Sequence, residues 1–178
     1  MPIVKLPYNK KTVEVEIDNK NFAAVLEPEQ FNCETGLTEE KIVEKALDNP
    51  IDSPKLENLV KGKNNMVIIS SDHTRPLPSK ITMPILLRRI RRANSDIDIK
   101  ILIATGFHRA TTRQELIDKF GSEIVENENI VVHDSRDRNK LVKIASFSSG
   151  WDLEINKVAA ETELLIAEVP TFYNRSYG

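Results

Sequence analysis

The sequence predicts an α/β fold in which helices flank an open, largely parallel β-sheet, with an antiparallel β-hairpin at the N-terminus. Four short apolar runs, at residues 66–69, 98–104, 129–132 and 164–167, have the length and composition of buried strands. Segments with helical spacing of apolar residues separate the first three runs. Because strands that alternate with helices form parallel sheets, we expect a ligand site at the carboxyl ends of these strands.

The N-terminal segment follows a different pattern. Residues 3–6 and 12–17 alternate apolar with polar or charged side chains, and residues 8–11 between them favour a turn. This pattern predicts an antiparallel hairpin, to which residues 21–26 are expected to add a third strand.

Apolar spacing and capping residues predict the positions of the helices. Thr38 is expected to cap a helix that ends within residues 49–54, and residues 56–60 are expected to form a further helical turn. A later helix is predicted from about residue 112 to residue 120, where Thr112 and Glu115 have the spacing of a capping box.

The helix between residues 79 and 92 contains a proline and a basic cluster. We expect it to start at Thr82, because Pro84 then lies in the first turn, where its missing N–H is tolerated. Four arginines near its end are expected to form a solvated helix terminus that complements the helix dipole. They are Arg88, Arg89, Arg91 and Arg92.

The 178 residues, of which 40% are hydrophobic, have the composition of one globular domain. We expect a hairpin appendage over residues 1–30 and a Rossmann-like core over residues 31–178. The single cysteine, Cys33, excludes an internal disulfide and a thiolate metal cluster, and it favours a reducing, cytoplasmic location. Trp151 is expected to be a packing anchor.

Charge and hydropathy argue against two classes of partner. The 25 basic and 27 acidic residues give a formal net charge of -2, which provides no broad attraction toward nucleic acid or a membrane surface. Apolar runs stay well short of the ~20 residues that span a bilayer. We therefore expect neither a nucleic-acid partner nor a membrane partner.

Several common catalytic motifs are also excluded. The six glycines, at positions 36, 62, 106, 121, 150 and 178, cannot form G-x-G-x-x-G, a P-loop or the G-x-S-x-G elbow. The three histidines are too far apart in sequence for a local metal motif, so no metal ligand is assigned within this chain.

Polar side chains follow two of the predicted strands. Residues 70–76, with the sequence SSDHTRP, come after the first strand, and residues 105–109 come after the second. If these strands are parallel neighbours, their backbones lie ~4.8 Å apart and both loops share one edge of the sheet. Arg75 and His108 are then able to contact one small molecule.

Each of these residues has a binding role and a structural alternative. Arg75 suits a carboxylate or phosphate, which a guanidinium holds with two parallel hydrogen bonds, or it forms an internal salt bridge. Asp72 is able to orient Arg75, to cap the next segment or to bond a ribose hydroxyl. The Thr74 hydroxyl suits an anion or a backbone group. His108, beside the permissive Gly106, is a candidate acid/base or a structural histidine.

The remaining polar candidates have stronger structural alternatives. Arg109 is a possible anion-binding residue, but Glu115 is available as an ordinary partner. His73 points to the side opposite Asp72 if the strand continues, and we expect it to be structural or exposed. His133 follows the third predicted strand, where a structural role is favoured.

Residues 72–76 and 106–111 together resemble the paired signature of the lactate racemase family, whose members use a nickel-pincer nucleotide cofactor. The resemblance extends from the N-terminal strands to about Val169. It implies that Asp72, Thr74 and Arg75 contact cofactor or substrate, with Arg75 near the substrate carboxylate. It also implies that His108 is one of two acid/base histidines in a 2-hydroxy acid racemase. Such a reaction needs a hydride acceptor, which no side chain provides.

The chain departs from this family in its last residues. Residues 168–173 contain no histidine where the family presents its second acid/base histidine. The family then continues to a cofactor-bearing lysine, a nickel-binding histidine and a C-terminal domain. The resemblance therefore implies an N-terminal part of a two-domain enzyme, inactive and without cofactor by itself, whose partners are a 2-hydroxy acid and the C-terminal domain. Two alternatives stay open: a non-catalytic module that binds a nucleotide, a hydroxy acid or a partner subunit, and an α/β domain whose motifs serve only packing.

Overall fold

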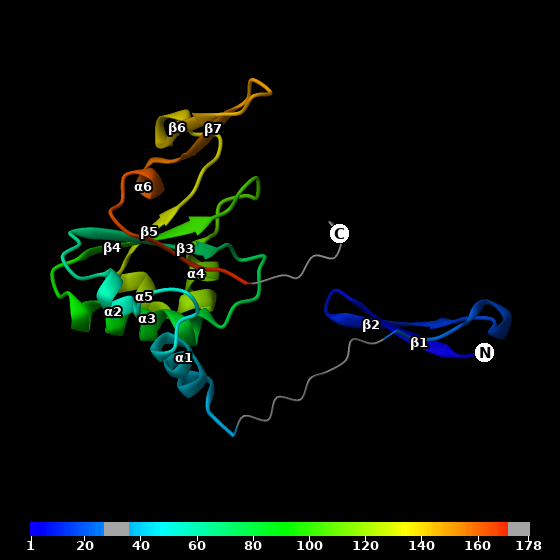
Figure 1. The fold of residues 1–178 in the computed structure, drawn as a ribbon. Helices are drawn as coiled ribbons and strands as arrows, with labels where there is room; N and C mark the ends of the chain where they lie inside the picture. Colours follow the sequence, from blue (N-terminus) through cyan, green and yellow to red (C-terminus); the bar gives the residue numbers. More distant parts are fainter. Residues whose placement is uncertain (27–35, 171–178) are drawn as a thin grey trace. The chain divides into compact units, whose positions relative to one another are not determined.

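A computed structural model describes residues 1–26 and 36–170 of the chain (Figure 1). The chain divides into two compact units, Met1–Gly36 and Leu37–Gly178, and each is described by itself. Cys33 and residues 171–173, which entered the expectations above, lie outside the described residues.

The first unit is the predicted antiparallel hairpin, formed by β1 (Ile3–Tyr8) and β2 (Lys11–Glu16). Its register pairs Val4 with Val15 and Leu6 with Val13, so that alternate residues give one apolar face.

The expected third strand over residues 21–26 is wrong. A short 3-10 helix, η1 (Asn19–Asn21), follows β2 instead. The Asp18 side chain accepts a hydrogen bond from the Lys20 amide and turns the chain there. Alternation of apolar residues was too short in this segment to outweigh the local turn.

The second unit contains a four-stranded parallel sheet, which confirms the α/β fold class. Its strands lie in the order β5 (Asn129–Val132), β4 (Asp98–Ala104), β3 (Asn65–Ser71) and β8 (Leu165–Glu168). All three pairings are parallel. The carboxyl ends of the strands therefore meet at one edge of the sheet.

Helices cover the sheet, as Figure 1 shows, with α2 to α5 on one face and α6 beyond the other. Thr38 caps the first helix and Thr112 forms the expected capping box at the fourth. The helices are α1 (Glu39–Asp48), α2 (Leu56–Leu59), α3 (Ser79–Ala93), α4 (Arg113–Phe120), α5 (Ser122–Asn127) and α6 (Lys157–Ala160), with a 3-10 turn η2 (Arg138–Lys140).

The core lies between the sheet and these helices. Alternate residues of β3 and β4 point to the helical face, where they meet the apolar stripes of α3 and α4. Burying each such side chain contributes ~1.5–3 kcal/mol, so this layer fixes the ends of β3 and β4. Its central members are Met66, Ile68, Ile101, Ile103, Met83, Leu87, Ile90, Leu116 and Phe120.

Helix α3 begins earlier than expected, at Ser79 rather than at Thr82. Pro84 consequently lies inside the helix, where it cannot donate to the carbonyl of Lys80. Both residues are exposed, so water is able to solvate that carbonyl. The amides of Ile81 and Thr82 already bond to the carbonyl of Pro78, which closes the first turn.

A second hairpin was not predicted from the sequence. Strands β6 (Leu141–Ser146) and β7 (Asp152–Asn156) pair antiparallel and extend away from the sheet in Figure 1. Trp151 lies at its tip and is 76% exposed, so the expectation of a packing anchor is wrong. The Phe147 amide donates to the Trp151 carbonyl, which shows that this segment closes a turn.

Candidate active site at the ends of β3 and β4

The two polar loops singled out above lie beside one another. Ser71, the last residue of β3, pairs in register with Ala104, the last residue of β4. Both loops therefore leave the same edge of the sheet and border one open cleft of about 340 Å³. The cleft is lined by Ser71, Asp72, Arg75, Ala104, Thr105, Gly106, His108, Val169 and Pro170.

Asp72 is the buried centre of this cleft, with only 2% of its surface exposed. Its Oδ1 accepts hydrogen bonds from the Thr74 backbone N–H at 3.0 Å and from the Thr74 hydroxyl at 2.6 Å. Its Oδ2 lies 2.6 Å from His108 Nδ1. The Asp72 carboxylate thus links the loop after β3 to the loop after β4.

These contacts also determine the charge of Asp72. Burial acts to raise the pKa of Asp72, but the hydrogen bonds from Thr74 and His108 outweigh burial, so the pKa lies below its ordinary value. Asp72 is therefore a carboxylate at neutral pH and acts only as an acceptor.

The carboxylate in turn fixes the tautomer of His108. Because Asp72 accepts, His108 Nδ1 must carry the proton, and Nε2 of the neutral ring then bears a lone pair. The His108 side chain is 49% exposed, which leaves Nε2 accessible to a ligand in the cleft. This carboxylate and imidazole pair is the arrangement of a general base with its orienting group.

The turn that carries His108 depends on Gly106. Its φ of 56° lies in the left-handed region, and the His108 amide donates to the Thr105 carbonyl at 2.9 Å across the turn. Thr105 is anchored in turn, since its hydroxyl donates to the His133 carbonyl. Phe107 is 92% exposed on the same turn and does not line the cleft.

Two further groups offer hydrogen bonds to a ligand. Arg75 is an exposed side chain at the cleft, on a turn in which its amide donates to the Asp72 carbonyl. Ser71 lines the same cleft, and its buried hydroxyl has no hydrogen-bond partner among residues 1–26 and 36–170. Buried hydroxyls are nearly always satisfied, so a ligand oxygen is a suitable partner for Ser71. The sequence analysis did not assign Ser71 a role.

The other polar candidates are turned away from the cleft. Arg109 pairs with Glu115, which its guanidinium reaches with two nitrogens. His73 Nδ1 lies 3.1 Å from the Thr111 hydroxyl, on the side toward α4. His133 Nδ1 contacts the Asn156 amide at 3.1 Å. Arg109, His73 and His133 therefore each have a partner within the protein, as expected for residues with a structural role.

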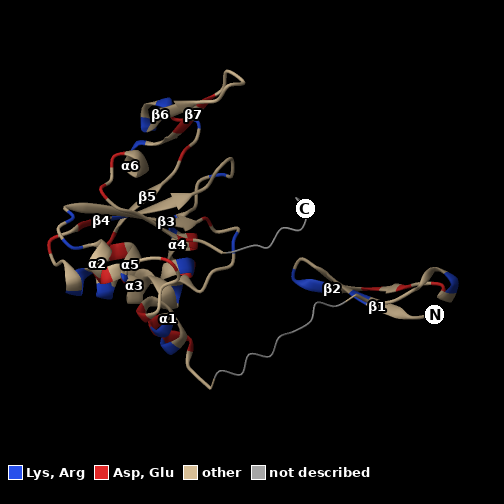
Figure 2. Ribbon diagram, viewed as in Figure 1, with Lys and Arg blue, Asp and Glu red and all other residues tan. Residues whose placement is uncertain are grey.

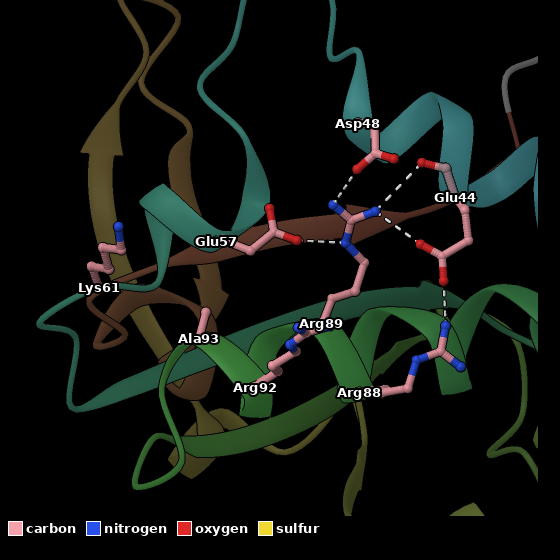
Figure 3. A pocket seen from close by; sticks show the side chains of 8 residues that line it. All are labelled: Glu44, Asp48, Glu57, Lys61, Arg88, Arg89, Arg92 and Ala93. Carbon is pink, nitrogen blue, oxygen red and sulfur yellow. Dashed lines mark hydrogen bonds and ion pairs between the residues drawn. The ribbon is translucent and has the colours of Figure 1, made fainter.

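A different cavity, of about 610 Å³, lies where α1 and α2 meet α3 (Figure 3). The guanidinium of Arg89 is surrounded there by three carboxylates, those of Glu44, Asp48 and Glu57. The hydrogen bond with Arg89 lowers the pKa of Glu57, although burial opposes this. The expected solvated helix end is therefore wrong for Arg89, whose side chain is 13% exposed. Its charge is fully used to hold α1 and α2 against α3.

Residues of both charge signs are interspersed along α1 and the neighbouring helices, as the colours of Figure 2 show. Within residues 1–26 and 36–170, no group of three or more His, Cys, Asp or Glu is placed to hold a metal ion. None of the helices in these ranges is long and apolar enough to cross a membrane.

Comparison with known proteins gives one consistent result. Residues 8–170 match the model of the lactate racemase N-terminal domain. The lactate racemase of Lactiplantibacillus plantarum is 54% identical over 168 residues, which are 94% of this chain and 40% of the relative. That of Thermoanaerobacterium thermosaccharolyticum is 47% identical over 168 residues, 94% of this chain and 39% of the relative.

A solved structure agrees with this match. The lactate racemase apoprotein from T. thermosaccharolyticum superimposes with a TM-score of 0.81 at 46% identity, covering 93% of this chain and 38% of that chain. The chain thus spans about two fifths of the length of these relatives. Because the domain match covers residues 8–170, this chain belongs to the lactate racemase family and corresponds to the family's N-terminal domain.

Proposed function

We propose that this chain is the N-terminal portion of a 2-hydroxy acid racemase of the lactate racemase type, with the cleft at β3 and β4 as its part of the active site. The observation that carries the proposal is the contact between Asp72 and His108. It joins two loops that lie far apart in the sequence into one acid/base pair. The family relationship supports lactate as the first substrate to test.

His108 exchanges the proton of the substrate hydroxyl. Its Nε2 lone pair accepts this proton, and the Asp72 carboxylate stabilises the imidazolium that forms. A 2-keto acid would form if the α-hydrogen also left as hydride, for which the bound cofactor would supply the acceptor, and on return of the hydride His108 would give the proton back to the oxygen. When the carboxylate and the α-hydrogen are held in fixed positions, the hydroxyls of the two enantiomers point in different directions, so His108 serves one hand and a second acid/base group serves the other.

Arg75 binds the substrate carboxylate. A guanidinium at the cleft edge is able to hold both carboxylate oxygens with parallel hydrogen bonds and so fixes the α-carbon relative to His108. Ser71 offers its unpartnered hydroxyl to a further oxygen of substrate or cofactor.

The donors of this cleft fit a nucleotide cofactor as well as a hydroxy acid. The unsatisfied Ser71 hydroxyl and the cationic Arg75 suit phosphate or ribose oxygens, whereas Thr74 supports the cleft through the hydrogen bond from its hydroxyl to Asp72. When bound, the nickel-pincer nucleotide supplies the hydride acceptor that amino-acid side chains lack. We assign no metal ligand to this chain, so the residues that hold nickel belong to the remainder of the family's polypeptide.

The domain organisation follows from the same proposal. The hairpin over residues 1–30 is an appendage, and residues 31–178 are a Rossmann-like core to which the C-terminal domain adds the rest of the cleft. By itself the chain is inactive, and its location is cytoplasmic. No histidine is present at Glu168, Val169 or Pro170 to act as the second acid/base group.

The test is a fused protein. Residues 1–170 of this chain are joined to the part of the L. plantarum lactate racemase that follows its matched segment, and the protein is produced together with cofactor-building enzymes. We expect nickel in the purified protein and interconversion of D- and L-lactate. His108→Ala should abolish interconversion and retain nickel, whereas Phe107→Ala, on the same turn but outside the cleft, should change neither. Full turnover in His108→Ala would contradict the role of His108. Binding of lactate without turnover would favour the alternative that this chain is a non-catalytic binding module.

A further inference from the structure

A buried acid at the end of β8 has no place in the chemistry above. Glu168 is 8% exposed, and its two carboxylate oxygens are engaged separately. Oε2 accepts from the Ser70 hydroxyl at 2.7 Å, and Oε1 accepts from the Thr82 hydroxyl. Ser70 is the register partner of Glu168 on β3, whereas Thr82 belongs to α3. One side chain therefore joins an edge strand to the neighbouring strand and to a helix.

A lysine of α4 carries an enclosed ammonium group. Lys119 Nζ makes no hydrogen bond to any of the described residues. Burial lowers the pKa of Lys119, while Glu168 and Asp72 act in the opposite direction through their charges. The other titratable groups that border a cavity with Lys119 are His73, Arg75, Glu115 and Asp118. A buried ammonium without hydrogen bonds is costly, and the nearby carboxylates offset that cost.

The residues that follow Glu168 form part of the cleft. Val169 and Pro170 line it together with Asp72 and His108. They leave a strand of only four residues that pairs on one side, with β3. Such a short edge strand has few backbone hydrogen bonds to hold its end. The hydrogen bonds of Glu168 therefore hold the end of β8 directly before the two residues that line the cleft.

We propose that Glu168 is a positioning residue which, with Ser70 and Thr82, locks the end of β8 and keeps Val169 and Pro170 fixed as a wall of the cleft. The significance of this wall for turnover rests on the proposed function. The lock itself is a property of this chain and is tested without activity.

The experiment compares two identical changes at opposite ends of β8. Glu168→Gln alters the lock, whereas Glu163→Gln alters the exposed carboxylate that bonds to Asn64 before the strand begins. We expect Glu168→Gln to accelerate amide hydrogen exchange in β8 about tenfold, since hydrogen bonds to a charged group are replaced by weaker ones. Exchange in β4 should stay unchanged, and Glu163→Gln should leave the exchange of Glu168 and Val169 at the wild-type rate.

Thr82→Val provides a milder variant, because it removes only one donor to Glu168 and keeps the shape of the side chain. It should raise exchange in β8 in the same way and to a smaller extent. The proposal is overturned if exchange in β8 matches wild type in both Glu168→Gln and Thr82→Val, or if β4 accelerates equally. In the fused protein, Glu168→Gln should lower kcat at unchanged nickel content. Because exchange is measured in the chain alone, an inactive fusion would count against the proposed function and not against the lock.

Discussion

Asp72→Asn changes one atom of the cleft and has a defined consequence for His108. The Thr74 backbone N–H can only donate, so the oxygen of the new amide must stay at the Oδ1 position, where it accepts both bonds from Thr74. The amide nitrogen then takes the Oδ2 position, 2.6 Å from His108 Nδ1 in the wild-type protein. Two N–H donors cannot face each other, so His108 must move its proton to Nε2.

The expected loss of stability is set by the Thr74 bonds. Hydrogen bonds to a charged acceptor contribute ~1.5–3 kcal/mol each and neutral ones ~0.5–1.5 kcal/mol, so weakening two of them costs about 2 kcal/mol. The bond to His108 adds little, because that side chain is half exposed. Urea unfolding followed by far-UV circular dichroism measures this loss. Trp151 is too exposed to be a sensitive fluorescent probe. Asp98→Asn, at the exposed start of β4, is the control and should change stability by less than ~0.5 kcal/mol.

The dependence of this loss on pH has a definite sign. The pKa of Asp72 is lower in the folded protein than in the unfolded chain, where it is about 3.9. Its ionised form therefore stabilises the protein above about pH 4, and this contribution disappears as the pH falls through the lower folded value. The stability difference between wild type and Asp72→Asn should narrow as the pH falls below about 4.

Imidazole ¹⁵N spectra should report protonated Nδ1 in wild type and protonated Nε2 in Asp72→Asn. Unchanged spectra, or a stability difference that persists undiminished to pH 3, would refute the account of Asp72.

Three further outcomes follow from the same contacts. Arg75→Lys in the fused protein should raise KM for lactate with a smaller effect on nickel content, because a single ammonium replaces a bidentate guanidinium. Kinetics equal to wild type would contradict the binding of the substrate carboxylate by Arg75. Arg89→Met should lower the free energy of unfolding by about 3 kcal/mol, because three carboxylates lose their shared partner. The control Arg88→Met, at a side chain 63% exposed, should cost less than ~1 kcal/mol. Equal effects of the two changes in urea unfolding would rule out the Arg89 network as a main link between α3 and the helices α1 and α2. Ser71→Ala should leave stability within ~0.5 kcal/mol of wild type, since its hydroxyl has no partner, and should weaken cofactor retention in the fused protein; a clear loss of stability would indicate an internal partner instead.

The strands of the sheet were predictable because their apolar runs are bounded by polar residues. The start of α3 was not, because proline in a helix interior removes one hydrogen bond, and that cost alone was used to place the boundary. The carbonyl that loses its donor belongs to the exposed residue Lys80, and the first turn is closed by the bonds of Ile81 and Thr82 to Pro78. The β6–β7 hairpin was missed although residues 152–156 alternate polar and apolar side chains, because its strands are short and few of their side chains are buried.

The site was predictable to the extent that it lies at strand ends. Sequence reasoning brought Asp72, Arg75 and His108 to one edge because parallel strands end together. It could not assign Ser71, since only a three-dimensional structure shows a buried hydroxyl without a partner. It could not assign Glu168 either, because the donors to this carboxylate are 98 and 86 residues away in the sequence. A charged residue at the end of an apolar run is the one signal that was present for Glu168.

The pairing of β8 with β3 also bears on how the protein is made. Ser70 and its partner Glu168 are 98 residues apart, so the ribosome completes β3 long before its neighbour exists. During that interval one margin of the nascent sheet has unmet backbone donors and acceptors, which are able to recruit other chains. Synthesis of β8 covers the open side of β3, and the chaperone dependence of this sheet should fall once β8 has been made.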